Sequence, residues 1–185
     1  MNEPSLDFEQ IYITYFSAMK RFAKEYVISE EDAENIVQDV FADIWEKRDL
    51  LSFHINLIAY LFMSIKNRCI DHLRSKIRNE EVTNDLQEEF QMAARLKYDA
   101  LEAFDKNLFS EKDIEKVITN AIDNLPEKCR EIFIKSKIEG KKHKEIAAEL
   151  NVSINTIESQ MSIAYRKLKQ ELKNYAPLLL FLILI

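Results

Sequence analysis

Glycine and proline are almost absent from this chain of 185 residues, which contains one Gly and three Pro. Sheet proteins need such residues in their turns, and they show an alternation of polar and apolar positions that is scarce here. Glu, Lys, Leu, Ile and Ala are abundant instead, and most of these residues favour helices. The sequence therefore predicts an all-α protein, long enough for one or two domains with a substantial core.

Cysteine and histidine are too scarce to indicate a disulfide framework or a metal site. Cys69 and Cys129 have no metal-ligand spacing around them, so buried reduced thiols are expected. The three histidines, His54, His72 and His143, are scattered along the chain. No nucleophile, base and orienting acid can be combined from the sequence. We therefore expect no metal, no cofactor, no small-molecule substrate and no enzymatic activity.

Long apolar runs are missing as well. Residues 1–7 do not combine a basic segment with an apolar one, so no secretory signal is expected and the chain is predicted to be cytoplasmic. Eight apolar residues follow Pro177, whereas a membrane span needs about 20. We expect this tail to pack onto the body of the protein or onto a partner.

Charge is distributed in alternating blocks rather than evenly. The net charge of −6 divides into −7 for residues 1–50, +3 for residues 51–80, −6 for residues 81–124 and +4 for residues 125–185. This pattern indicates two blocks that could face nucleic acid, separated by acidic blocks that could face a partner or solvent.

Apolar residues recur at helical spacing in three N-terminal segments. Helices are predicted from Asp7 to about Tyr26, from Ser29 to about Lys47, and over residues 55–77, with Asp7 and Ser29 as N-caps. The second helix has an acidic outer face, which in most proteins only faces water. The third is basic in its C-terminal half, as a helix along a phosphate backbone would be, although cations there also suit the helix dipole.

The apolar periodicity is lost in an acidic stretch over residues 79–89 and returns only weakly over residues 90–104. We therefore predict two small helical domains, at residues 1–80 and 111–175, joined by a flexible linker at residues 81–110 and followed by the apolar tail at 176–185. Four helices are expected in the second domain. Ser110 is a predicted N-cap, Pro126 begins a helix, and Gly140 ends one.

The last two helices of the second domain have the pattern of a helix-turn-helix. Two apolar stripes at helical spacing consist of Ile146, Ala147 and Leu150, and of Ile157, Met161, Ala164 and Leu168. Between them, Asn151 tolerates a left-handed backbone and Ser153 can cap the following helix. The second helix would then present its polar face to a DNA major groove. Many helical bundles share this pattern without binding DNA, so the motif alone leaves both interpretations open.

Three stretches in this order resemble the extracytoplasmic-function class of bacterial sigma factors, within the sigma-70 family. The stretch Asp32–Trp45 resembles the polymerase-binding helix of region 2, and Leu61–Lys76 resembles the helix that melts the promoter and reads the minus-10 element. Residues 125–168 resemble region 4, which reads the minus-35 element. The apolar tail resembles that of sigma factors of the Bacteroidetes type.

The resemblance implies roles for individual residues. Binding to a basic coiled coil of core RNA polymerase is implied for Asp32, Glu34, Gln38, Asp39, Asp43 and Trp45. Minus-10 contacts are implied for Phe53, His54, Lys66, Asn67, Arg68 and Arg74, the first two as candidates to hold a flipped-out base. Minus-35 contacts are implied for Lys144, Asn155, Thr156, Glu158, Ser159, Ser162 and Arg166. Relatives often have arginines where this chain has Glu158 and Gln160, so its minus-35 sequence stays open.

We therefore expect a sigma factor that binds core RNA polymerase and promoter DNA, melts the promoter and directs initiation. The resemblance also implies a membrane-anchored anti-sigma factor as a partner. The alternative is a helix-turn-helix transcriptional regulator that acts without replacing sigma. A third class, a membrane-attached scaffold, would depend on the tail.

Overall fold

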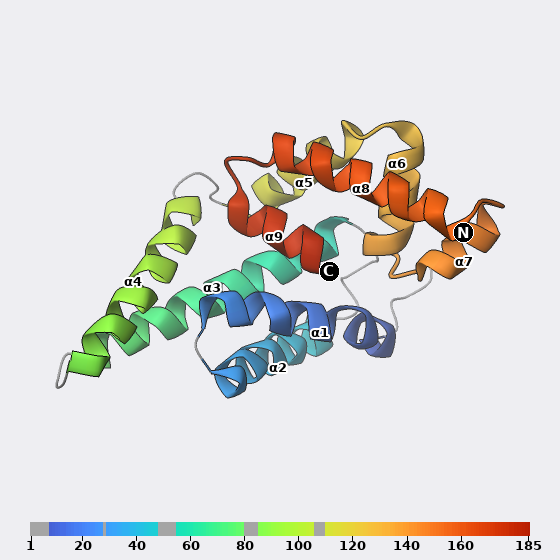
Figure 1. The fold of residues 1–185 in the computed structure, drawn as a ribbon. Helices are drawn as coiled ribbons and strands as arrows, with labels where there is room; N and C mark the ends of the chain where they lie inside the picture. The colour runs from blue at the N-terminus through green and yellow to red at the C-terminus, as the bar shows by residue number, and fades with distance from the viewer. Residues whose placement is uncertain (1–7, 28, 48–54, 80–84, 106–109) are drawn as a thin grey trace.

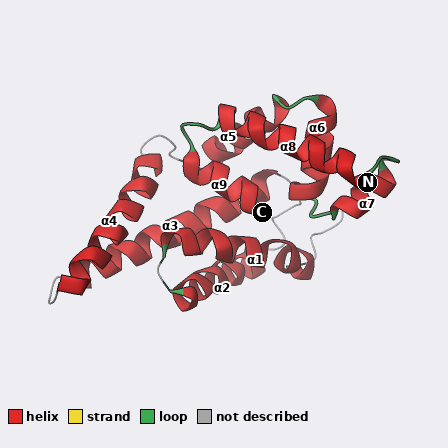
Figure 2. Ribbon diagram, in the orientation of Figure 1, coloured by secondary structure: helices red, strands yellow, loops and turns green. Residues whose placement is uncertain are grey.

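The computed structural model of the chain consists of helices packed around one continuous apolar core (Figures 1 and 2). It describes residues 8–27, 29–47, 55–79, 85–105 and 110–185. Within these ranges helices are the only regular secondary structure, which confirms the predicted all-α class.

The first three helices pack against one another as a small bundle. They are α1 (Phe8–Tyr26), α2 (Glu30–Lys47) and α3 (Ile55–Asn79), which agree with the predicted helices to within about two residues. The Ser29 hydroxyl accepts a hydrogen bond from the backbone N–H of Asp32 at 2.9 Å, so the predicted N-cap of α2 is confirmed. Large side chains of this bundle such as Tyr15, Phe22 and Phe62 are fully buried in the folded chain.

The predicted linker at residues 81–110 contains a helix, α4 (Asp85–Asp105), so the expectation of a flexible segment is wrong there. This helix packs along α3 and buries Ala94 and Leu101, two turns apart, on its inner side. The two buried residues form a narrow stripe between exposed residues such as Met92 and Leu96. Such a stripe has a weak periodicity signal, which explains why the sequence pattern did not predict the packing.

The second group of helices comprises α5 (Glu111–Asp123), α6 (Glu127–Phe133), α7 (His143–Glu149) and α8 (Ile154–Glu171). Ser110 caps α5 as predicted, since its hydroxyl accepts from the backbone N–H of Asp113 at 3.3 Å. The helix predicted to reach Ile138 does so, but its last turn is a wider π-helix, η2 (Ile134–Ile138). Gly140 follows it with φ +68°, the conformation expected of a residue that ends a helix.

The two groups of helices pack against each other. Helix α3 contacts α5, and the Tyr15 hydroxyl of α1 donates to the Ile138 carbonyl oxygen at 2.7 Å. Burial raises the pKa of Tyr15 well above its usual value, so this phenol stays a donor. A Cβ atom on Gly140 would lie 2.6 Å from Thr14 Cγ2, so the turn after η2 approaches α1 closely at this point. The division into two domains at the predicted boundaries stays a prediction.

The apolar tail forms a further helix, α9 (Ala176–Leu184), which contacts α1, α4 and α8. Figure 1 shows it, in red, between α8 and the N-terminal helices. Leu178, Phe181 and Leu182 are fully buried, and burial of such side chains is worth about 1.5–3 kcal/mol each before the cost of ordering the chain. The expectation that the tail packs onto the body of the protein is therefore confirmed.

Candidate nucleic-acid interface

Helices α7 and α8 are joined by a tight turn of defined geometry. Asn151 has φ +51°, the left-handed conformation predicted for it. The N–H of Val152 donates to the Ala147 carbonyl at 3.0 Å, and that of Asn151 to the Ala148 carbonyl at 3.3 Å, the hydrogen-bond pattern of a Schellman ending. Two residues later the Ser153 hydroxyl accepts from the Thr156 N–H at 3.0 Å and caps α8. The turn therefore fixes the direction in which α8 leaves α7.

The inner face of α8 is the apolar stripe predicted for it. Ile157, Met161, Ala164 and Leu168 are all buried, and α8 packs on α6 and α7. On α7, Ile146 and Ala147 are buried and Leu150 is half-buried. The helix-turn-helix predicted from the sequence is therefore present, with the small Ala147 inside it.

The outer face of α8 is polar and exposed over more than three turns. Its exposed side chains include Asn155, Thr156, Glu158, Ser159, Ser162 and Arg166, and Lys144 is exposed on α7. All seven residues predicted for the minus-35 contact are thus accessible. An exposed polar face on the second helix of a helix-turn-helix has the dimensions and donors needed to enter a major groove. Contact of these residues with DNA stays a prediction.

Gln160 differs from its neighbours, because it is half-buried rather than exposed. The Cys129 thiol of α6 donates to its side-chain oxygen at 2.8 Å. Gln160 therefore lies at the border between the inner apolar stripe and the outer polar face of α8. Burial also raises the pKa of Cys129, which favours the thiol that makes this bond.

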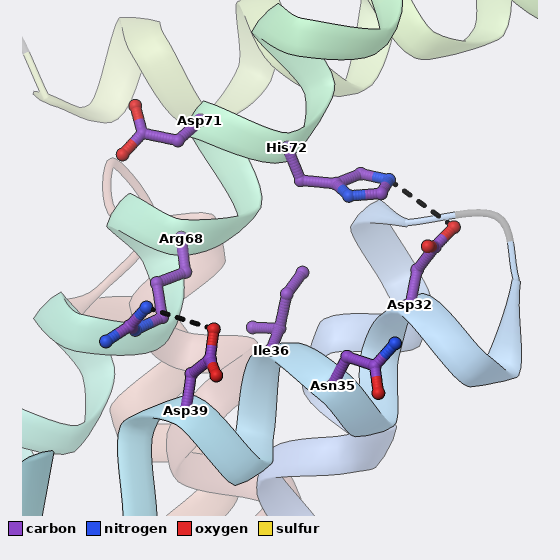
Figure 3. Close-up of a pocket in the computed structure, with 7 residues that line it drawn as sticks. All are labelled: Asp32, Asn35, Ile36, Asp39, Arg68, Asp71 and His72. Carbon is purple, nitrogen blue, oxygen red and sulfur yellow. Dashed lines mark hydrogen bonds and ion pairs between the residues drawn. The ribbon is translucent and has the colours of Figure 1, made fainter. Parts of the chain in front are cut away.

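Helices α2 and α3 bring opposite charges together at a surface pocket. Arg68 on α3 donates to Asp43 at 2.7 Å and to Asp39 at 3.2 Å on α2. His72 Nε2 lies 3.5 Å from an Asp32 carboxylate oxygen, as Figure 3 shows for the same pocket. The pocket has a volume of about 340 Å³ and is lined by Asp32, Asn35, Ile36, Asp39, Arg68, Asp71 and His72.

This arrangement changes the interpretation of the acidic and basic faces. Three of the carboxylates predicted to bind polymerase already pair with α3, and Glu34 pairs with Lys20 of α1 at 2.8 Å. Pairs this exposed contribute only about 0–1 kcal/mol each, so a partner could replace them at little cost. An ionised carboxylate has about four acceptor positions, so a second cation can also bind without breaking the first pair.

Two further residues of the predicted polymerase face are accessible. Gln38 is exposed on α2, and the Trp45 side chain is 51% exposed near the end of the same helix. The Trp45 ring also packs edge-on against Phe8 of α1, with centroids 5.0 Å apart. All six residues predicted for this face therefore lie along α2, and their contact with polymerase stays a prediction.

The residues predicted for the minus-10 contact differ in exposure and in the partners that they already have. Lys66 is fully buried, so its prediction as a phosphate contact is wrong in this conformation. Asn67 is exposed, whereas Arg68 is held by the two aspartates described above. Arg74 is exposed but bound to Asp71 at 3.0 Å and to Tyr98 of α4 at 3.5 Å. Phe53 and His54 lie outside the described residues.

Spacing places the charged residues on single helix faces, although it does not identify the pairs that they form. Asp32, Asp39 and Asp43 lie seven and four residues apart, and Arg68 and His72 four apart, so each set occupies one helix face. An acidic stripe on one helix and a basic stripe on the next favour contact between those two helices. Which stripes meet depends on how the helices rotate against each other, and this a single helix pattern does not determine.

Comparisons with known proteins match both groups of helices. The family description "Sigma-70 region 2" matches residues 11–79, which span α1 to α3, and "Sigma-70, region 4" matches residues 115–168, which include the helix-turn-helix. The ECF RNA polymerase sigma factor RpoE of Cereibacter sphaeroides is 24% identical over 166 residues, covering 89% of this chain and 86% of that protein. The ferric citrate uptake sigma factor FecI of Escherichia coli is 24% identical over 160 residues, covering 86% and 87%.

A three-helix acidic domain followed by a helix-turn-helix domain, each matching its own sigma region in the expected order, defines a promoter-specificity factor of RNA polymerase. The chain belongs to the sigma-70 family, as a member of its extracytoplasmic-function class, and it directs transcription initiation. Within the described residues, no helix is long and apolar enough to cross a membrane.

Proposed function

We propose that this sigma factor binds core RNA polymerase through α2, contacts the minus-10 element through α3 and reads the minus-35 element with α8. The observation that carries the proposal is the pairing of an accessible acidic helix in one half with an exposed helix-turn-helix face in the other. As a sigma factor, this chain would direct initiation, and the polymerase would carry out the chemistry of RNA synthesis.

On α2, the polymerase contact would add to the intramolecular pairs. Asp39 remains 66% exposed and Asp43 42% exposed although Arg68 binds both. A basic partner helix would meet these carboxylates, with Gln38 and Trp45 beside them. Complementary charge of this kind accelerates association and selects the partner, although it adds modestly to affinity.

On α3, Asn67 and Arg74 are the accessible residues for the minus-10 DNA. Arg68 would join them only after exchange of its aspartates for phosphates. Exposure of Lys66 would need a rearrangement of α3. We therefore expect Asn67 and Arg74 to contact the minus-10 DNA first, and Arg68 and Lys66 only after these rearrangements.

A charge placed on α2 tests the polymerase contact. Gln38→Lys adds a cation to the exposed acidic face without breaking a described bond, and Asn120→Lys adds the same charge at an exposed position on α5. We expect Gln38→Lys to weaken binding to core RNA polymerase by about tenfold or more, because like charges would meet, and Asn120→Lys to leave it unchanged. An equal effect of both variants would contradict the proposed face.

The alternative, a helix-turn-helix regulator that does not replace sigma, predicts a different behaviour with DNA. Such a regulator would bind duplex promoter DNA tightly and specifically without polymerase, whereas the proposed factor should bind it poorly alone. A cytoplasmic location and a membrane-anchored anti-sigma factor also belong to this proposal. Copurification of an endogenous membrane protein that covers α2 or α8 would support the second point.

A further inference from the structure

The apolar helix α9 packs between the two sigma regions. Phe181 lies edge-on against Phe22 of α1, with centroids 5.2 Å apart, and against Phe62 of α3, with centroids 5.4 Å apart. Leu178 and Leu182, on the same side of the helix, are fully buried. Since α9 also contacts α8, it joins region 2 to the recognition helix (Figure 1).

The polar end of α9 is held by one cation from each region. Arg21 of α1 donates to the Leu184 carbonyl at 2.8 Å, and Lys137 of η2 donates to the Ile183 and Ile185 carbonyls at 3.0 Å each. These carbonyls lack partners within the helix and carry the negative end of its dipole. Burial lowers the pKa of Lys137 to about 8, and the positive charge of the nearby Arg21 acts in the same direction.

In the arrangement that α9 holds, α3 and α8 lie too close together to contact both promoter elements at once. The minus-10 and minus-35 elements are about 25 base pairs apart, or roughly 85 Å along the duplex. Helix α3 packs on α5, and α5 packs on α8. Each such layer adds about 8–10 Å, so α3 and α8 lie only about 20 Å apart. The two DNA-reading helices must therefore separate before one chain can engage both elements.

We propose that α9 is an intramolecular latch, a segment that holds regions 2 and 4 closed and must leave Arg21, Lys137 and its apolar site before the factor can work. The consequence for transcription rests on the function proposed above, whereas the closed arrangement does not. If only the open form binds polymerase productively, the apparent dissociation constant is raised by the inverse of the open fraction. The latch thereby lowers the activity of the factor when polymerase is limiting.

Distance measurements between spin labels test the latch directly. Labels on Glu25→Cys in α1 and Gln170→Cys in α8 would report the separation of the two regions, and both positions are exposed whereas the native thiols are buried. Two latch variants are compared with the parent chain: Phe181→Ala, and Arg21→Gln combined with Lys137→Gln. The matched control is Ile183→Ala, a truncation on the same helix at a side chain that is 40% exposed.

We expect both latch variants to add a population with longer distances and the control to match the parent. Circular dichroism establishes that each variant keeps its helices, and if Phe181→Ala does not fold, the polar double variant alone decides the result. Unchanged distances in the folded latch variants would overturn the proposal.

Binding to core RNA polymerase tests the functional consequence. Phe181→Ala should raise the apparent affinity for core RNA polymerase by about tenfold. Loss of a buried phenylalanine shifts the equilibrium between the closed and open forms by at least that factor. Longer distances with unchanged affinity would overturn the regulatory role of the latch. Failure of the parent chain and all variants to bind polymerase would contradict the proposed function instead, and the distances would still decide whether α9 closes the molecule.

Discussion

Substitution of Gly140 tests the packing between the two sigma regions with a magnitude that the structure defines. A Cβ atom at Gly140 would lie 2.6 Å from Thr14 Cγ2 and 3.0 Å from Thr14 Oγ1, so rotation of the threonine only exchanges one close contact for another. Overpacking of this kind costs about 1–3 kcal/mol. The φ of +68° adds about 1–2 kcal/mol for any residue with a Cβ. Gly140→Ala should therefore lower the free energy of unfolding by about 2–5 kcal/mol.

Thr14→Ala separates the two contributions, because it removes both close atoms and leaves only its own Cβ at 3.4 Å. In the Thr14→Ala background, Gly140→Ala should cost only the backbone strain. A double-mutant cycle measured by urea denaturation should therefore give a coupling energy of about 1–3 kcal/mol between residues of different regions. A coupling below about 0.5 kcal/mol, the usual additivity error, would refute the packing of α1 against the turn after η2.

The remaining predictions concern the cap of α8, the proposed DNA contact of Arg166 and the half-buried Lys137. Ser153→Ala should cost about 1 kcal/mol and lower the melting temperature by about 2–4 °C, since the hydroxyl caps α8, whereas Ser159→Ala on the exposed face should leave it unchanged. Arg166→Ala should weaken minus-35 recognition by the holoenzyme by about 1–3 kcal/mol, and equal losses on promoter and scrambled duplexes would make Arg166 a phosphate contact instead. The pKa of Lys137, about 8 by burial, should rise toward the ordinary lysine value of 10.5 in Phe181→Ala when followed by NMR titration. Because burial lowers this pKa, the folded state binds fewer protons than the unfolded state, and the free energy of unfolding should rise as pH increases from about 8 to 10.5. A pKa of Lys137 that does not change in Phe181→Ala would contradict burial by α9 as the cause.

The helices of both regions could be predicted because their signals are local. Apolar spacing predicted α1, α2 and α3 to within about two residues, and the hydrogen bonds of the caps Ser29, Ser110 and Ser153 are present. Asn151 and Gly140 adopt left-handed conformations, which asparagine tolerates and which glycine adopts readily because it lacks a Cβ atom. These features depend on a few neighbouring residues, which a sequence displays directly.

Relations between helices could not be predicted in the same way. The pairing of Arg68 with Asp39 and Asp43, and the burial of Lys66, depend on the rotation of α3 against α2. A basic face was therefore interpreted as DNA-facing although part of it neutralises the acidic helix beside it. The position of α9 was open for the same reason, because a uniformly apolar segment has no polar face to indicate its orientation.

Mapping of transcript start sites tests the central claim most directly. Purified core RNA polymerase would be combined with the parent chain on a library of promoter fragments, and the 5′ ends of the transcripts would be sequenced. The account predicts initiation at defined sites that share minus-10 and minus-35 sequences, with no such transcripts from core polymerase alone. Tight, sequence-specific duplex binding by the chain without polymerase, together with no defined start sites in its presence, would contradict it.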